Sequence, residues 1–221
     1  MIFGLVGGIG CGKSLVGGLF VEFGAGLIDA DVIGHELLSD SAISEQIRSY
    51  FGECVFCNIN GVNCVDRFEL ARIVFAQTEA GFAGRKYLNS ILHPPITKII
   101  NEKIQYLTQK NFNIIILDAP LLLETGFDKI ADKIIFIDAS RENRLARVLK
   151  RNWTENDLKL RESAQLPIEK KRQLADFIIP NNNTIADTKK EVELLLQKFK
   201  PKNSETNSHN SNNNAETEFV F

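Results

Sequence analysis

The sequence lacks the features that mark several large classes of protein. Its 221 residues include no apolar run long enough to cross a bilayer, so no membrane partner is expected. The N-terminal stretch carries no basic segment before its apolar run, which is unlike a secretory signal and predicts a cytoplasmic protein. Basic residues are not in excess, and the net charge of −2 argues against broad binding of nucleic acid.

The sequence has few cysteines, and their spacing does not match that of a zinc finger. The chain has four cysteines, of which Cys54, Cys57 and Cys64 lie close together in the sequence. No fourth ligand follows them at finger-like spacing, so zinc is the less favoured interpretation. Three reduced thiols in a loop-rich region is the favoured one.

A glycine-rich segment, GGIGCGKS at residues 7–14, comes directly after an apolar run. It has the Walker A spacing, in which four residues separate Gly7 from Gly12, Lys13 and Ser14. Glycines let backbone N–H groups converge on phosphates, the lysine adds charge, and the serine hydroxyl can ligate Mg²⁺. A chance glycine-rich turn is the alternative. The strand-like run before the segment and the helix-like run after it favour a nucleotide-phosphate site.

Strand-like and helix-like segments alternate along the chain, which predicts an α/β fold of three layers around a central parallel sheet. The expected strands are continuous apolar runs at 1–6, 26–29, 113–118, 133–138 and 176–180. The expected helices are 13–23, 31–38, 41–51, 67–76, 94–109, 141–151, 154–165, 167–175 and 186–199. A hydrophobic fraction of 44% fits one sizeable core.

Two regions depart from this alternation. Residues 60–110 contain no convincing strand, which predicts a helical insertion that binds an acceptor, set in a nucleotide-binding core of 1–59 and 111–199. From Asn203 to Asn214, nine of twelve residues are Asn or Ser, so residues 200–221 are predicted to be a disordered tail.

Three aspartates come at the ends of expected strands. Asp29 and Asp31 end the second strand, and Asp118 ends the third, as a Walker-B-like acid would. Because strand carboxyl ends line the ligand crevice of such sheets, these acids should face the phosphate loop. A carboxylate at Asp29 or Asp31 could take a proton or help hold Mg²⁺. Alternatively, it could cap the following helix, and the local sequence leaves both interpretations open.

A basic segment runs from residue 141 to 172. A helical run of this kind is usually a solvated face. In a small kinase it is instead the natural lid, which brings guanidinium groups onto the transferring phosphate and excludes water. Its arginines are Arg141, Arg144, Arg147, Arg151, Arg161 and Arg172.

Taken together, these segments resemble the dephospho-CoA kinase family over residues 1 to about 198. The phosphate loop is common to many enzymes, but its combination with the other motifs is specific. The matching segments are GLVGGIGCGKS (4–14), IDAD (28–31), VDRFEL (65–70), LHP (92–94), DAPLLLETG (118–126), RVLKR (147–151), RESAQ (161–165), EKK with AD (169–176) and IIPNN (178–182).

The resemblance implies an activity and its partners. A P-loop enzyme of this family would use ATP and Mg²⁺ to phosphorylate the ribose 3′-hydroxyl of 3′-dephospho-CoA, giving coenzyme A and ADP. This is the final step of coenzyme A biosynthesis. We expect a monomer or weak homo-oligomer that binds ATP and dephospho-CoA.

The resemblance also implies site residues. Asp31, Lys13 and Arg147 would be catalytic, with Asp31 orienting or deprotonating the hydroxyl. Arg67 and His93 would contact the acceptor, although His93 is equally well explained as a helix-start residue before Pro94. The residues expected to bind ATP are Gly10, Cys11, Gly12, Lys13, Ser14, Leu15, Arg151 and Asn181, with Ser14 also on Mg²⁺.

Two rival functions share part of this pattern. Another small P-loop kinase, acting on a nucleoside or nucleotide, would differ only in its acceptor region. A GTP-dependent switch would need an Asn-Lys-x-Asp box, and the chain has none. Leu15 stands where many family members have Thr, and Thr97 where an Arg often follows the His-Pro step. The latter weakens any prediction of how the acceptor's own phosphates are held.

Overall fold

The computed structural model describes residues 1–59, 61–119, 121–151 and 153–199. A five-stranded sheet forms its centre, in the order β2 (Gly26–Asp29), β5 (Ile115–Asp118), β1 (Ile2–Gly7), β6 (Lys133–Asp138) and β7 (Phe177–Pro180). Every neighbouring pair of strands is parallel. The predicted parallel sheet is therefore confirmed. The predicted tail at 200–221 lies outside the described residues.

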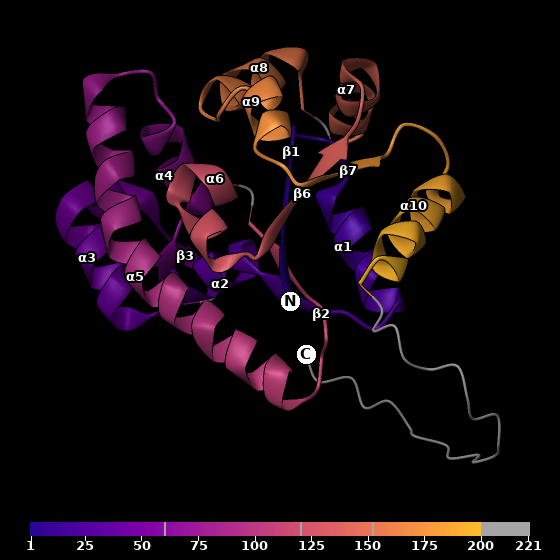
Figure 1. Cartoon of the computed structure of the whole chain (residues 1–221). Coiled ribbons are helices and arrows are strands. Elements are labelled where there is room, and N and C mark those ends of the chain that lie inside the picture. Colours follow the sequence, from indigo (N-terminus) through magenta and orange to yellow (C-terminus); the bar gives the residue numbers. More distant parts are fainter. Residues whose placement is uncertain (60, 120, 152, 200–221) are drawn as a thin grey trace.

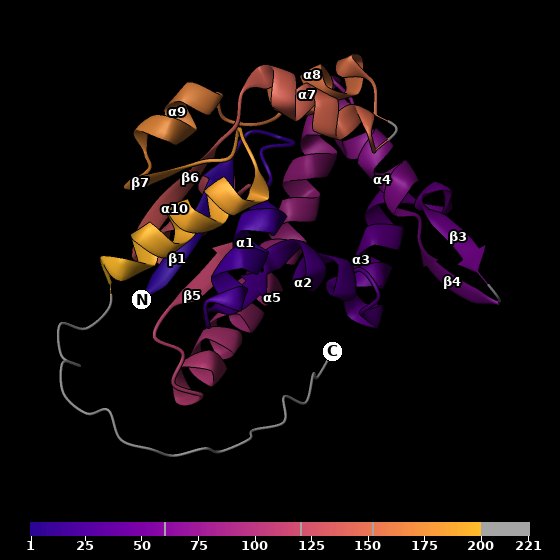
Figure 2. The same cartoon turned by 90° about the vertical axis from the view of Figure 1, so that its right-hand side faces the viewer.

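Helices cover both faces of this sheet (Figures 1 and 2). On one face, α1 (Lys13–Glu22) and α10 (Ile185–Gln197) pack Phe20 and Val192 onto Phe3 and Leu5 of β1. On the other face, α2 (Ala30–Leu37), α5 (Glu79–Gln109) and the short α6 (Leu122–Thr125) and η2 (Phe127–Ile130) enclose a second core. The three-layer architecture follows from strands that are apolar on both faces.

A third, smaller core lies beside the sheet. It is built from α3 (Ser41–Phe51), η1 (Glu53–Val55), the hairpin β3 (Phe56–Ile59) and β4 (Val62–Val65), α4 (Arg67–Val74) and part of α5. Figure 2 shows the hairpin at the outer edge of this region. The prediction that residues 60–110 contain no strand is wrong, because β4 lies within them and pairs antiparallel with β3.

Helix α5 is much longer than predicted. It begins after the N-cap Thr78, whose hydroxyl accepts a bond from the Gly81 N–H, and it runs through Pro94 and Pro95. The predicted start at residue 94 is wrong because proline at a first helical position is only a tendency. Packing on both sides of the prolines holds the helix: Gly84 lies against Phe51 of α3, and Ile96 belongs to the second core.

Three helices lie above the carboxyl edge of the sheet: α7 (Arg141–Leu149), α8 (Glu155–Ser163) and α9 (Ile168–Gln173) (Figure 1). Helix α8 begins at a capping box between Thr154 and Asp157. The three helices correspond to the basic segment predicted from the sequence. No helix in the described part of the chain combines the length and hydropathy needed to cross a membrane.

Candidate active site

The phosphate loop joins β1 to α1 at the carboxyl edge of the sheet. Gly10 and Gly12 have left-handed φ angles of +78° and +96°, which side chains with a Cβ rarely adopt. Gly12 caps α1 without a side-chain hydrogen bond, so the N–H groups at the start of this helix are open to an anion. Lys13 begins the helix, and Ser14 follows it at the surface. The sequence prediction of a phosphate cradle fits this geometry.

Cys11 fills space under the loop. Its side chain is buried, and burial raises the pKa of its thiol, with Lys13 opposing the shift. The Cys11 N–H bonds to the Gly8 carbonyl at 3.0 Å, which closes the turn. This residue therefore contributes backbone and packing to the loop.

Arg147 and Asn181 brace the loop from behind. The Arg147 guanidinium donates to the carbonyls of Cys11 at 2.9 Å, Gly10 at 3.3 Å and Asn181 at 2.7 Å. The amide of Asn181 donates to the Cys11 carbonyl at 2.7 Å, and the Thr188 hydroxyl donates to its oxygen at 2.9 Å. Asn181 is 2% exposed. Both side chains thus hold the loop's carbonyls, while contact of Arg147 with a phosphoryl group stays a prediction.

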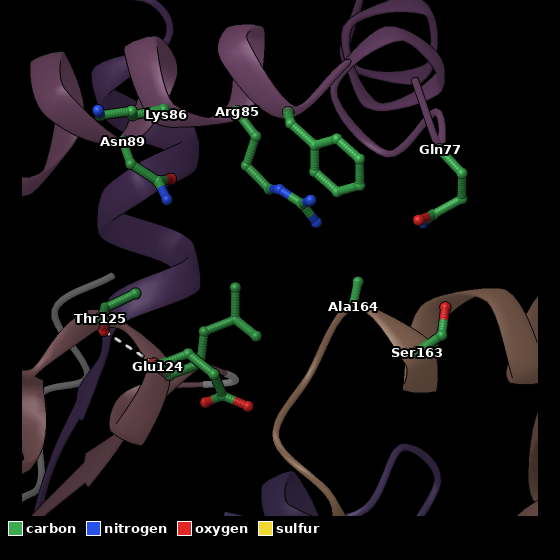
Figure 3. A pocket seen from close by; sticks show the side chains of 10 residues that line it. Gln77, Arg85, Lys86, Asn89, Glu124, Thr125, Ser163 and Ala164 are labelled. Atoms are coloured by element: carbon green, nitrogen blue, oxygen red, sulfur yellow. Dashed lines mark hydrogen bonds between the residues drawn. The ribbon is translucent and has the colours of Figure 1, made fainter. Parts of the chain in front are cut away.

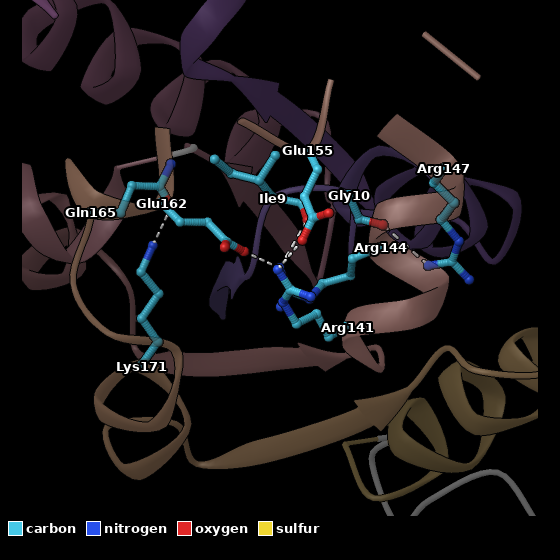
Figure 4. Close-up of polar contacts among 9 residues, drawn as sticks. All are labelled: Ile9, Gly10, Arg141, Arg144, Arg147, Glu155, Glu162, Gln165 and Lys171. Atoms are coloured by element: carbon cyan, nitrogen blue, oxygen red, sulfur yellow. Dashed lines mark hydrogen bonds and ion pairs between the residues drawn. The ribbon is translucent and has the colours of Figure 1, made fainter. Parts of the chain in front are cut away.

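Arg144 is a further brace that the sequence pointed to only as one of a basic series. It is 5% exposed, and its Nη1 donates to the Ile9 carbonyl at 3.3 Å and pairs with Glu162 of α8 (Figure 4). At the surface, Arg141 bonds to Glu155 at 2.7 Å. Arg151 is exposed after the end of α7. Helix α7 therefore uses its arginines mainly to join the loop to α8.

Glu124 and Lys171 form a second junction, which sequence reasoning missed. Lys171 of α9 is 2% exposed, and its Nζ lies 2.9 Å from Oε1 of Glu124 and 2.8 Å from Oε1 of Gln165 (Figure 4 shows the latter). The same Glu124 oxygen accepts a bond from the Leu166 N–H at 2.8 Å. The turn between α8 and α9 is thus fixed to α6 by a buried ion pair.

The three predicted aspartates meet at the ends of β2 and β5. Asp29 and Asp118 are register partners on these neighbouring strands. Oδ1 of Asp29 accepts bonds from the N–H groups of Asp31 at 2.9 Å and Val32 at 3.1 Å. Asp29 is therefore the N-cap of α2, and the Asp31 carboxylate is left for other interactions. The capping role that the sequence left open thus belongs to Asp29, while proton transfer or Mg²⁺ binding by Asp31 stays a prediction.

The acids and Lys13 share one electrostatic environment. Asp118 is 7% exposed, and its Oδ1 has no partner among the described residues. Burial, reinforced by Asp29 and Asp31 and opposed by Lys13, raises its pKa to about 6. The pKa of Asp31 is also raised, first by its partly desolvated surroundings and then by Asp29, with Lys13 and His35 opposing. The crevice thus places a cation and three acids beside the phosphate loop.

The two predicted acceptor contacts lie in the third core and α5. Arg67 is the exposed first residue of α4. His93 lies inside α5, half-buried, with its ring 5.5 Å from that of Phe127, and burial lowers its pKa. The alternative of a helix-start histidine is therefore wrong. Within the described ranges, no hydrogen bond or ion pair joins Arg67 or His93 to Lys13 or Asp31.

The remaining cysteines lie on or beside the hairpin. Cys57 and Cys64 face each other across β3 and β4 with their Sγ atoms 3.6 Å apart, and Cys54 bonds to the Phe51 carbonyl at 3.2 Å. Among residues the structure describes, no cluster of three or more His, Cys, Asp or Glu side chains is placed to hold a metal. The favoured interpretation of free thiols agrees with this, although the region is a hairpin and not a loop.

Comparison with known proteins assigns the family. A model of the dephospho-CoA kinase family matches residues 1–187. The chain belongs to the dephospho-CoA kinase family. This family of kinases uses ATP in the final step of coenzyme A biosynthesis. The predicted family, enzyme class and P-loop kinase fold are confirmed.

Individual relatives extend over nearly the whole chain. A dephospho-CoA kinase of Carboxydothermus hydrogenoformans is 36% identical over 201 residues, which is 90% of this chain and 94% of that protein. One from Bacillus licheniformis is 34% identical over 89% of this chain and 95% of its own. Among solved structures, the dephospho-CoA kinase from Campylobacter jejuni has a TM-score of 0.64 at 30% identity, covering 90% of this chain and 96% of its own.

Proposed function

We propose that this dephospho-CoA kinase family member transfers the γ-phosphoryl group of ATP to the ribose 3′-hydroxyl of 3′-dephospho-CoA. The observation that carries the proposal is the crevice in which Lys13, Asp31 and Asp118 meet beside the phosphate loop. A phosphate cradle and a proton acceptor at one edge of the sheet are what such a transfer needs. The loop would hold ATP through Gly10 to Leu15.

Asp31 is the proposed proton acceptor. Its carboxylate is not used in capping α2, because Asp29 does that work through two backbone N–H groups. The raised pKa of Asp31 brings its basicity closer to neutral pH than that of an ordinary aspartate. The 3′-hydroxyl proton would pass to Asp31 as the 3′-oxygen bonds to the γ phosphorus and the bond to the β-phosphate oxygen breaks, releasing ADP.

Charge on the transferring group would be stabilised by groups fixed in advance. The open N–H groups at the start of α1 and the Lys13 ammonium face the phosphates. Arg147 and Arg151 are the proposed lid cations. The contacts of Arg147 to three carbonyls support a role in holding the loop's shape. The buried Asn181 supports the same role. We also propose that Asn181 lies on the side of the loop where the adenine of ATP binds.

The crevice fits a divalent ion that arrives with the nucleotide. The buried Oδ1 of Asp118 has no partner among described residues. Burial, together with the neighbouring acids, raises the pKa of its carboxyl, so a cation nearby would stabilise the charged form. Ser14 would supply a hydroxyl ligand, and Asp118 would accept from the ion's water. Mg²⁺ bound there would neutralise charge on the phosphates.

The helical region at 60–110 is the proposed acceptor-binding insertion, with Arg67 and His93 as candidate contacts. The exposed guanidinium of Arg67 could meet an anionic part of the acceptor. His93 lies in α5 beside Phe127 of η2, and its proposed contact with the acceptor is made from this helix. We further propose that the protein works in the cytoplasm as a monomer or weak homo-oligomer.

The first experiment measures ADP release from ATP·Mg²⁺ with 3′-dephospho-CoA, adenosine, AMP or phosphopantetheine as acceptor. We expect release only with dephospho-CoA, and a product that co-elutes with coenzyme A. Release with AMP or adenosine and none with dephospho-CoA would overturn the proposal and support the rival nucleoside or nucleotide kinase.

A further inference from the structure

A cavity of about 420 Å³ lies between α5, α6 and the end of α8. Arg85, Asn89 and Gln77 point into it from the side of α5, and Glu124 and Ala164 lie opposite (Figure 3). Its walls therefore come from the helical region on one side and from α6 and the end of α8 on the other. A ligand in it would touch both.

The cavity carries uncompensated positive charge. No carboxylate in the described part of the chain lies within ion-pair distance of Arg85 or Lys86. The one acid in the wall, Glu124, pairs through Oε1 with the buried Lys171, while its buried Oε2 has no partner among the described residues. Arg85 is half-buried, with its guanidinium 5.2 Å from the ring centre of Phe82. A guanidinium withdrawn from water without a carboxylate partner favours an anionic ligand.

The remaining polar lining of the cavity is uncharged. Asn89 is half-buried and Gln77 brings a second amide, while the Ser163 and Thr125 hydroxyls donate to the carbonyls of Leu160 and Leu121. Amide N–H groups beside a guanidinium can satisfy several oxygens of one anion at once. The Asn89 and Gln77 amides therefore fit a phosphate-type anion better than an apolar group, while the two hydroxyls are used within the protein.

The cavity also lies next to the phosphate loop. A second, smaller cavity is lined by Gly8 and Ile9 of the loop, and by Glu162 and Gln165. Residues 162–166 therefore form the partition between the two cavities, because Ser163 and Ala164 line the first.

We propose that Arg85, assisted by Lys86 and Asn89, binds the diphosphate of the acceptor in this cavity. The inference rests on the proposed function, since it takes dephospho-CoA as the acceptor. Because the cavity wall includes α6 and the end of α8, the diphosphate would bridge the acceptor helices and the α7–α9 segment.

The test compares wild type with Arg85→Gln, Arg85→Lys and the control Lys103→Gln, which removes an exposed charge farther along α5. Isothermal titration measures the binding of dephospho-CoA and of ATP. We expect Arg85→Gln to weaken dephospho-CoA binding about tenfold or more, as for loss of a charged hydrogen bond. Arg85→Lys should recover part of this loss. ATP binding, thermal stability and the Lys103 control should stay within about twofold of wild type.

Three results would overturn the inference. One is dephospho-CoA binding by Arg85→Gln within twofold of wild type. Another is an equal loss of ATP binding, which would indicate general disturbance. The third is Arg85-dependent binding of inorganic pyrophosphate that does not compete with dephospho-CoA, which would assign the cavity to a separate anion. Failure of the proposed function would give a different result. The wild-type protein would then bind dephospho-CoA without releasing ADP from ATP, or would not bind dephospho-CoA at all.

Discussion

Behind the phosphate loop, Arg144, Arg147 and Asn181 each donate to a carbonyl of residues 9–11, whereas in front of it Asp31 and Asp118 keep carboxylate oxygens free. We call Arg144, Arg147, Asn181, Lys171 and Glu124 the braced side of the crevice. The open side is Asp31, Asp118 and Arg85. The polar groups of the braced side bond mainly to other groups of the protein, whereas those of the open side are available to a ligand.

The two sides differ in whether their polar groups have partners before a ligand binds. The braced side positions the phosphate cradle before any nucleotide arrives, so little reorganisation is left for the reaction. On the open side, Asp118 is buried and Arg85 is half-buried, so these two charges cost free energy until a ligand compensates them. Donor binding should therefore be robust to changes at Asp31 and Arg85, and acceptor binding and chemistry should not.

Asp31→Asn should have the largest effect. Loss of the proposed base is expected to lower turnover about 10²- to 10⁴-fold while leaving the ATP dissociation constant nearly unchanged. Because the pKa of Asp31 is raised, wild-type turnover should fall with decreasing pH through a pKa above that of an ordinary aspartate. Steady-state kinetics and ATP titration test this.

The matched control is Asp29→Asn, since asparagine also caps helices well and the cap of α2 should survive. Its turnover should fall far less. An equal loss of turnover and ATP binding in Asp31→Asn would show that Asp31 is structural, and would place it on the braced side.

Lys171→Met should reduce the free energy of unfolding by about 3 to 5 kcal/mol, because it leaves the Glu124 carboxylate buried without its partner. Urea denaturation measures the loss. The double variant Lys171→Met with Glu124→Leu should recover much of it, since it removes both charges. A single variant as stable as wild type would contradict the assignment of this pair to the braced side.

Asp118→Asn should stabilise the nucleotide-free protein in a chelating buffer at pH 8. The folded-state pKa of about 6 lies above the ordinary value of 3.8, so the folded state holds this proton more tightly than the unfolded state. The contribution of Asp118 to stability is therefore full below about pH 4 and is lost as pH rises toward about 6.

The gain at pH 8 should be at most about 3 kcal/mol, from roughly two pK units, and should vanish near pH 4. Thermal melts at both pH values test it. A variant less stable than wild type at pH 8 would show that the carboxylate is already compensated. The same variant should lose kinase activity if Asp118 faces the nucleotide's metal ion.

Cys57→Ser and Cys64→Ser should have the smallest effects. The hairpin that carries them lies at the outer edge of the third core (Figure 2), and each thiol is only partly buried. We expect changes in stability within about 1 kcal/mol and unchanged turnover. Metal analysis of wild type should show no stoichiometric zinc. Zinc bound by wild type and lost in Cys57→Ser would restore the metal interpretation.

Local patterns predicted the sheet, the phosphate loop and the α7–α9 segment, because each depends on neighbouring residues. The hairpin also had a local signal that was missed: an Asn-Gly pair at 60–61 between short alternating runs, with Gly61 at φ +83°. Helix α5 could not be predicted in full. Two prolines normally end a helix, and here packing against the second and third cores overrides them.

The bracing contacts lay beyond local patterns. Arg144 and Ile9 are 135 positions apart, and Asn181 and Cys11 are 170 apart. The sequence showed a run of arginines, but nothing in it distinguishes Arg144, which is buried against the loop, from Arg141, which pairs at the surface. That distinction depends on how α7 is placed over the sheet.

The phosphate loop of this protein is not a portable part. A Cβ on Gly8 would lie 2.9 Å from Nη1 of Arg144, one on Gly10 would lie 2.7 Å from the Arg144 carbonyl oxygen, and one on Gly12 would lie 2.3 Å from the Asn181 amide. Glycine is thus required at these positions because two distant segments pack closely against the loop, as well as because the backbone must approach phosphate. Residues 7–14 grafted into another scaffold would lose the side chains that donate to their carbonyls, so a working transplant would have to include α7 and the turn after β7.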